Sequence, residues 1–199
     1  MSATELVADG KEFLRLMSQC EGIIHTEKRL PEFVFRRPFA RYFAVEYAHI
    51  YRQQFGVLLH EMSVTFGDHS VSYLALDPRD EYLADSCFFG MISFTPSTLP
   101  DRYADVMHPT KGLTHILAGA NLGVFWGSSL EWGVFADRVS WELAVIATQK
   151  DVDVSKILGW PCFNAEQVKG YMTSQYHIKD PSDSIASNFN KRFFENYSI

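Results

Sequence analysis

The seven histidines are the most chemically versatile side chains of this chain, because imidazole binds metals and transfers protons near neutral pH. Zinc sites usually take two ligands within a few residues of each other on a helix or in a loop. Here the nearest histidines lie seven, nine and eleven residues apart. A site assembled from distant segments stays open, with His60, His69 and Asp68 as its closest set. We otherwise expect no metal site and no cofactor.

The three cysteines are the candidate nucleophiles, and each would need a lowered pKa and a nearby histidine to react as a thiolate. Cys20 falls at an expected helix end of the wrong polarity for a thiolate, and Cys87 precedes an apolar strand. Cys162 follows Trp160-Pro161 in an expected loop and is the best placed of the three. No glycine-rich phosphate loop or Gly-x-Ser-x-Gly motif accompanies them. We therefore name no catalytic residue.

The most distinctive segment spans residues 126–142, which hold three of the four tryptophans. Tryptophan and arginine dominate the energetics of protein interfaces, and clustered aromatic side chains also line ligand clefts. An aromatic sheet core with a surface Asp-Arg turn would explain the same residues. The candidate binding residues of this segment are Trp126, Trp132, Asp137, Arg138 and Glu142.

Basic residues gather between residues 28 and 52, where Glu32 and Glu46 are the only acids. The candidate docking patch within this region consists of Arg36, Arg37 and Arg41. It could meet an acidic partner or a phosphate. A solvated helix face followed by a loop would carry the same charges.

Composition narrows the function classes. The 199 residues include 18 Lys and Arg against 24 Asp and Glu, which gives a net charge of −6. This balance argues against a generic nucleic-acid binder, and the 15% aromatic content argues against a disordered chain. An acidic start without an apolar run, no long apolar window, and an odd number of dispersed cysteines favour a cytoplasmic protein without membrane contact.

Periodicity predicts the elements that would position these residues. We expect helices over 3–20, 39–66, 101–107, 165–174 and 184–197, and strands over 71–76, 88–94, 121–126, 132–136 and 141–147. Helices come first, then strands, then helices, without alternating βα units, which is typical of an α+β protein. The short loops between the last three strands predict a β-meander. We expect one domain over 1–199, with a mainly antiparallel sheet of about five strands packed on N- and C-terminal helices.

Residues 66–78 and 126–146 together resemble small bacterial proteins that are grouped with the immunity proteins of polymorphic toxin systems. Those proteins combine a helix-Gly-Asp-strand-Asp-Pro unit with a later tryptophan-containing Asp-Arg-x-x-x-Glu hairpin. The matching positions are Gly67, Asp68, Asp77, Pro78, Trp126, Trp132, Asp137, Arg138 and Glu142. The resemblance covers about half of the chain, and it implies no catalytic residues.

These observations predict a non-enzymatic, cytoplasmic, protein-binding protein, and the resemblance implies a toxin-neutralising immunity protein. An acidic inhibitor suits a basic toxin such as a nuclease, because complementary charge speeds encounter. The alternative is a small-molecule-binding domain or an enzyme, with a site assembled from distant residues around the Trp-rich hairpins. A third interpretation is a subunit of a larger assembly that docks through the arginine patch. The oligomeric state stays open.

Overall fold

A computed structural model gives the structure of the chain and describes residues 7, 9–77, 90–107, 120–175 and 184–197. Six strands form one antiparallel sheet in the order β1-β6-β5-β4-β2-β3. Their bounds are β1 (Arg41–Glu46), β2 (Val71–Asp77), β3 (Met91–Phe94), β4 (Leu122–Gly127), β5 (Trp132–Asp137) and β6 (Leu143–Thr148). The predicted α+β class and the β4-β5-β6 meander are confirmed.

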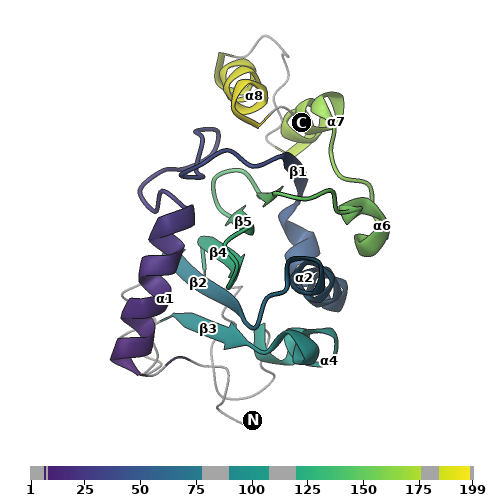
Figure 1. The fold of residues 1–199 in the computed structure, drawn as a ribbon. Coiled ribbons are helices and arrows are strands. Elements are labelled where there is room, and N and C mark those ends of the chain that lie inside the picture. The colour runs from purple at the N-terminus through teal and green to yellow at the C-terminus, as the bar shows by residue number, and fades with distance from the viewer. Residues whose placement is uncertain (1–6, 8, 78–89, 108–119, 176–183, 198–199) are drawn as a thin grey trace.

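Helices cover both faces of this sheet. The α-helices in the described part are α1 (Gly10–Ile23), α2 (Gln53–Phe66), α4 (Leu99–Met107), α6 (Val154–Leu158), α7 (Ala165–Gln175) and α8 (Ser184–Tyr197). Two short 3-10 helices, η1 (Tyr47–Tyr51) and η2 (Pro96–Thr98), precede α2 and α4. Figure 1 shows α1 on one side of the sheet and α2 with α4 on the other, while α7 and α8 lie near β1.

Local signals set most helix ends. The Asp9 carboxylate accepts hydrogen bonds from two N–H groups of the first turn, so α1 begins at Gly10. The first residues of the helix expected over 3–20 lie outside the described residues. Gly67 ends α2 in the left-handed conformation, with φ +69°, as its position predicts. Asn164 and Gln167 exchange side-chain-to-backbone hydrogen bonds at the start of α7, which is a capping box.

The expected helix over 39–66 is wrong in its first half, because residues 41–46 form strand β1. Phe43, Tyr47 and Ile50 recur at helical spacing, which led to the helix prediction. The same segment also alternates as a strand does: Tyr42 and Ala44 face one side of the sheet, and Phe43 and Val45 face the other. Pairing with the edge of β6 decides the outcome, since β6 is fully buried and would otherwise have an unpaired edge. The sheet therefore has six strands.

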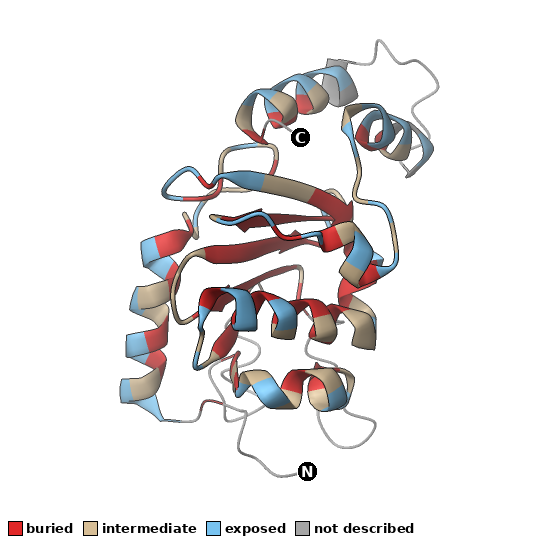
Figure 2. Ribbon diagram, turned by 45° about the vertical axis from the view of Figure 1, so that its right-hand side comes forward, coloured by how far each residue is buried: buried red, intermediate tan, exposed pale blue. Residues whose placement is uncertain are grey.

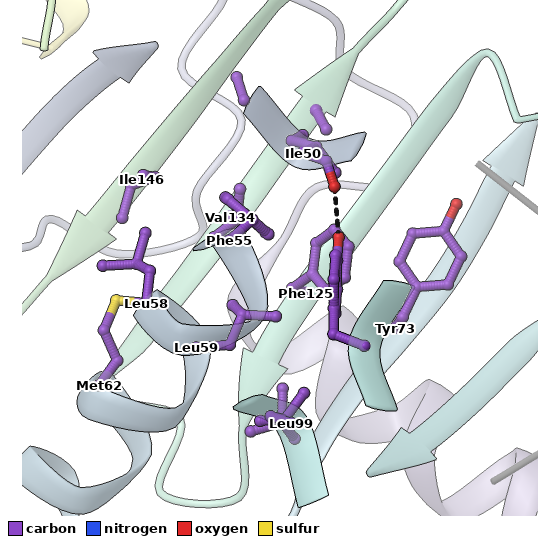
Figure 3. Close-up of a cluster of buried hydrophobic side chains, with 14 of the residues drawn as sticks. Ile50, Phe55, Leu58, Leu59, Met62, Tyr73, Leu99, Phe125, Val134 and Ile146 are labelled. Carbon is purple, nitrogen blue, oxygen red and sulfur yellow. Dashed lines mark hydrogen bonds between the residues drawn. The ribbon is translucent and has the colours of Figure 1, made fainter. Parts of the chain in front are cut away.

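The two faces of the sheet carry separate apolar layers, and Figure 2 shows the flanking helices turning their buried residues towards it. Phe125 and Val134 pack under α2 and α4, whereas Val124 and Phe135 face the layer of α1 and α8. Figure 3 shows the α2 layer. Here the hydroxyl of Tyr103, a buried residue of α4, donates a hydrogen bond to the Ile50 carbonyl at 2.7 Å. Each large apolar side chain buried this way contributes about 1.5–3 kcal/mol.

The two apolar layers pack against both faces of the β4-β5-β6 meander and so position the turns at its two ends. Residues 128–131 join β4 to β5 at one end, and residues 138–142 join β5 to β6 at the other. Because β1 pairs antiparallel to β6, Glu46 lies opposite Leu143 and Arg41 lies opposite Thr148. The β5–β6 turn therefore lies beside the end of β1 and the start of η1.

Candidate functional site

An open hollow of about 570 Å³ lies where the end of β1, η1, the β5–β6 turn and α7 meet. Its volume falls in the range of ligand pockets. We call it the Glu–Tyr hollow. Its lining residues are Glu46, Tyr47, Ala48, Tyr51, Arg138, Val139, Glu142 and Tyr171.

The main chain of Glu142 ties the walls of the Glu–Tyr hollow together. Its carbonyl accepts a hydrogen bond from the Tyr47 N–H at 2.8 Å and one from the Tyr171 hydroxyl at 3.2 Å. The residue itself has φ +51°, a left-handed conformation that costs a non-glycine residue about 1–2 kcal/mol. Such outliers persist only where the surroundings enforce them, and they concentrate at functional sites.

Two tyrosine rings from η1 form the apolar wall. The ring centroids of Tyr47 and Tyr51 lie 5.4 Å apart with an interplanar angle of 70°, an edge-to-face pair. Tyr47 is buried and Tyr51 is half-buried, so the wall is anchored in the protein on one side and reaches solvent on the other.

Two carboxylates and one guanidinium give the hollow its charge. Glu142 is exposed, and Glu46 and Arg138 are half-buried. The Arg138 guanidinium is 3.4 Å from the side-chain oxygen of Asn121, which positions it without neutralising it. Among the residues that the structure describes, no ion pair joins Arg138 to either glutamate. The lining thus carries one more negative than positive charge.

Of the candidate residues in the segment 126–142, the structure brings Arg138 and Glu142 together at this hollow. Trp126 and Trp132 are fully buried on opposite faces of the sheet, so they do not meet. Asp137 is also fully buried, and its Oδ1 accepts a hydrogen bond from the Ser140 N–H at 2.8 Å, which shapes the turn. Burial raises the pKa of Asp137.

The set of Asp68, His69 and His60 does not converge. Asp68 accepts hydrogen bonds from the Trp132 indole N–H at 2.6 Å and the Ser129 N–H at 2.5 Å. The Ser128 hydroxyl lies 2.9 Å from His69 Nδ1 and 3.3 Å from Asp68 Oδ1. His60 instead contacts the Pro96 carbonyl.

A serine nucleophile would need its histidine oriented by the acid, and nearby N–H groups left to stabilise an oxyanion. Here the acid contacts the serine directly and takes the neighbouring Ser129 N–H. We therefore interpret Asp68 as a clamp on the β4–β5 turn.

The three arginines of the candidate docking patch are all exposed. Arg36 and Arg37 donate to the carbonyl oxygens of Ile24 and Leu130, at 3.2 and 2.6 Å. Arg41 Nε lies 3.9 Å from an Asp151 carboxylate oxygen. The patch lies at the opposite end of β1 from the Glu–Tyr hollow.

The remaining reactive groups are dispersed. Cys20 is buried, and burial raises the pKa of the half-buried Cys162, which disfavours its thiolate. Cys87, His108, His115 and His177 lie outside the described residues. Within the described ranges, no group of three or more His, Cys, Asp or Glu side chains is placed to hold a metal ion. No helix in those ranges is long and apolar enough to cross a membrane.

Sequence reasoning missed four polar lining residues of the hollow: Glu46, Tyr47, Tyr51 and Tyr171. The first three were assigned to the helix over 39–66, where Tyr47 and Tyr51 looked like a buried stripe. The alternation in Arg-Tyr-Phe-Ala-Val-Glu was the signal that could have indicated a strand ending at Glu46.

This chain matches no protein-family model, no curated protein and no solved structure. Fold and site therefore define its class: an α+β protein with a six-stranded antiparallel sheet and an acidic, tyrosine-lined hollow at one end of an edge strand.

Proposed function

We propose that this chain is a non-enzymatic protein-binding protein whose Glu–Tyr hollow receives a basic side chain of its partner. The observation that carries the proposal is the pair of carboxylates, Glu46 and Glu142, beside the rings of Tyr47 and Tyr51. In the described part of the chain neither carboxylate forms an ion pair. The hollow thus combines negative charge with aromatic walls.

A lysine or arginine side chain suits these walls. A cation over a tyrosine face gains about 0.5–2 kcal/mol, and a hydrogen bond to a charged group contributes about 1.5–3 kcal/mol. The volume of about 570 Å³ can hold such a side chain with its aliphatic stem. Arg138 at the rim repels a misplaced cation and attracts a carboxylate of the partner, which would add specificity.

The composition of the lining supports binding over turnover. No serine, cysteine or histidine is among the described residues that line the hollow, so it offers no serine or cysteine nucleophile and no imidazole base. Val139, whose side chain is 60% exposed at the tip of the β5–β6 turn, adds an apolar contact at the rim.

We further propose that the partner is a basic protein toxin, which this chain neutralises by covering a functional surface. The net charge of −6 supports a basic partner, because complementary charge accelerates encounter at low salt. Arg138 and Glu142 are two of the positions that carry the resemblance to immunity proteins, and both line the hollow. This supports the same class of partner.

The test is affinity capture from a lysate of the protein's own organism at low and moderate salt, with mass spectrometry of what is retained. The wild type is compared with the double variant Glu46→Gln/Glu142→Gln and with a matched control, Glu21→Gln/Glu61→Gln, which removes two exposed carboxylates elsewhere. We expect one stoichiometric basic protein that the control retains and the hollow variant loses. Equal capture by both variants would contradict the proposal.

A small-molecule ligand is the second candidate, because the volume of the hollow also fits a small organic cation. Thermal unfolding with agmatine as the probe separates the two candidates. A saturable rise in Tm that Glu46→Gln/Glu142→Gln abolishes, together with no captured protein, would favour the small-molecule site.

A further inference from the structure

A second hollow, of about 490 Å³, lies at the opposite end of β1, beside the last turn of α8. Four aromatic side chains and one arginine are among its lining residues, and we call it the Phe–Arg hollow. These residues are Phe33, Phe39, Arg41, Tyr42 and Tyr197.

The aromatic wall is preformed. The ring of Tyr42 packs edge-on against Phe33 and Tyr197, with centroids 6.0 and 5.6 Å apart. The Tyr42 hydroxyl accepts from the Phe39 N–H at 2.7 Å, and the Tyr197 hydroxyl accepts from the Val34 N–H at 3.1 Å. Phe39 and Tyr197 are buried and anchor the wall, so the half-buried rings of Phe33 and Tyr42 can offer apolar surface without rearranging.

Positive charge surrounds this wall. Arg41 lines the hollow, and the Arg37 guanidinium carbon lies 5.5 Å from the centroid of the Phe39 ring. Arg37 and Arg36 are positioned by carbonyl oxygens, which orient a guanidinium but do not neutralise it. The contact of Arg41 with Asp151, at 3.9 Å, joins side chains that are 61% and 85% exposed, so it contributes little.

The backbone of β1 is available next to the same hollow. β1 is the outermost strand on its side of the sheet. The Phe163 N–H donates to the Ala44 carbonyl at 2.8 Å, so the peptide groups of Ala44 point away from β6. Pairing direction alternates along an antiparallel strand, and the N–H and C=O of Tyr42 therefore point outward as well. In the described ranges neither forms a backbone hydrogen bond outside the β-sheet ladder.

We propose that an extended acidic segment of a protein partner adds a strand to the first half of β1. Its backbone pairs with Tyr42, one of its apolar side chains enters the Phe–Arg hollow, and its carboxylates contact Arg41 and Arg37. Phe163 limits the added strand to this half, because it already pairs with Ala44. This site is separate from the Glu–Tyr hollow and does not depend on the function proposed for it.

The outward peptide groups favour a peptide over a free anion. A phosphate or carboxylate ion could use Arg41, but it would leave the Tyr42 peptide groups and the aromatic walls unused. An extended segment satisfies all three features at once, since its alternating side chains can meet the arginines on one side and the rings on the other.

The probes are fluorescein-labelled octapeptides that alternate Asp or Glu with Val, Ile, Phe or Tyr, and binding is measured by fluorescence anisotropy. We expect members of this panel to bind with a Kd below about 100 μM, while the same peptides with Lys in place of the acids do not bind. N-methylation of the peptide groups that face β1 should weaken binding about tenfold, because it removes the inter-strand hydrogen bonds. An unchanged Kd after N-methylation would overturn strand addition.

Protein variants separate the site from the overall charge. Arg41→Glu, and Arg37→Gln as a second variant, should each weaken binding about tenfold or more. Lys11→Glu makes the same charge change at an exposed position of α1, and it should alter the Kd less than about twofold. Equal losses in Arg41→Glu and Lys11→Glu would overturn the proposal, as would a panel without any binder at about 1 mM peptide.

Sedimentation of the protein alone tests a second copy as the occupant. We expect the same mass for the wild type and Arg41→Glu. A dimer that Arg41→Glu dissociates would place a second copy of this chain at the Phe–Arg hollow and overturn the partner segment.

Discussion

The two turns of the central meander are built around one aspartate each, yet the two aspartates work in opposite ways. The β4–β5 turn is held from outside by Asp68, which accepts hydrogen bonds from Ser129 and from the Trp132 indole. The β5–β6 turn is shaped from within by Asp137, whose Oδ1 accepts from Ser140. In the described structure, Asp137 Oδ2 is buried without a hydrogen-bond partner.

This difference separates a turn that fastens the fold from one that presents side chains. Contacts to Asp68, to the Ser70 carbonyl and from Arg37 connect the β4–β5 turn to the protein body. In the β5–β6 turn, Glu142 and Val139 are exposed at the rim of the Glu–Tyr hollow. Substitutions in the first turn should therefore reduce stability, whereas some in the second should change binding alone.

The largest effect is expected for Asp68→Ala. It removes the acceptor of a fully buried tryptophan N–H and of the Ser129 N–H, so the free energy of unfolding should fall by about 3 kcal/mol. Urea unfolding followed by tryptophan fluorescence measures it. Asp151→Ala, which removes an exposed carboxylate, should cost less than about 0.5 kcal/mol. A loss for Asp68→Ala as small as that of this control would contradict the clamp.

The second largest effect is expected for Gly127→Ala, at the end of β4 next to the same turn. A Cβ at Gly127 would collide with the Asp68 carboxylate and with Trp132 Nε1, so the clamp would have to shift, at a cost of about 1–3 kcal/mol. Gly170→Ala is the matched control. No atom lies within 4 Å of a Cβ built there, and a helical glycine replaced by alanine should gain about 0.5–1 kcal/mol. Two changes of the same sign in the unfolding midpoint would contradict this contrast.

Asp137→Asn should change how stability depends on pH. Burial raises the pKa of Asp137, so the folded chain binds this proton more tightly than the unfolded chain. The group's stabilising contribution is present below the unfolded pKa and is lost as the pH rises through the raised, folded pKa. Asparagine can still accept from Ser140 but does not titrate. As the pH rises above the unfolded pKa of about 4, the variant should therefore gain stability relative to wild type.

Urea midpoints measured across this pH range test the prediction. Asp105→Asn, on the exposed side of α4, serves as the control for removing a carboxylate. Parallel curves for wild type and Asp137→Asn would mean that Asp137 does not carry the effect.

The smallest effect on stability is expected at Glu142, where a substitution should raise the free energy of unfolding and not lower it. Asparagine tolerates the left-handed conformation better than glutamate, so Glu142→Asn should stabilise the fold by about 0.5 kcal/mol while weakening capture of a basic partner. Glu142→Gln keeps the backbone preference and loses the charge, so it should weaken binding without the gain in stability. Unaltered capture by both variants would exclude Glu142 from the binding site.

Sequence reasoning succeeded where local signals decide the structure. The apolar segments of β4–β6 with their short turns, the left-handed stop at Gly67, and the stripe of Phe189, Phe193 and Tyr197 in α8 were all readable from neighbouring residues. For β1 the local signals conflict, because its alternating residues also fit a helical stripe, and its partner β6, about 100 residues away along the chain, decides for the strand.

The same distinction between local signals and long-range pairing applies to the candidate sites. Arg138 and Glu142 could be singled out because a short turn between two strands exposes its side chains. Glu46 and Tyr47 could not, since they reach the hollow only through the pairing of β1 with β6. The alternation of residues permitted either an exposed or a buried position for Trp126 and Trp132. Because helices pack on both faces of the sheet, both tryptophans are buried.

β1 leaves the ribosome long before β6, so its Tyr-Phe-Ala-Val stretch must persist without its strand partner while about 100 further residues are synthesised. An unpaired apolar strand is a template for aggregation, and flanking charges are the usual protection. Arg36, Arg37 and Arg41 precede this stretch, and Glu46 follows it. Arg41 and Glu46, which line the two hollows in the folded protein, are thus also placed where gatekeeper charges protect a nascent strand.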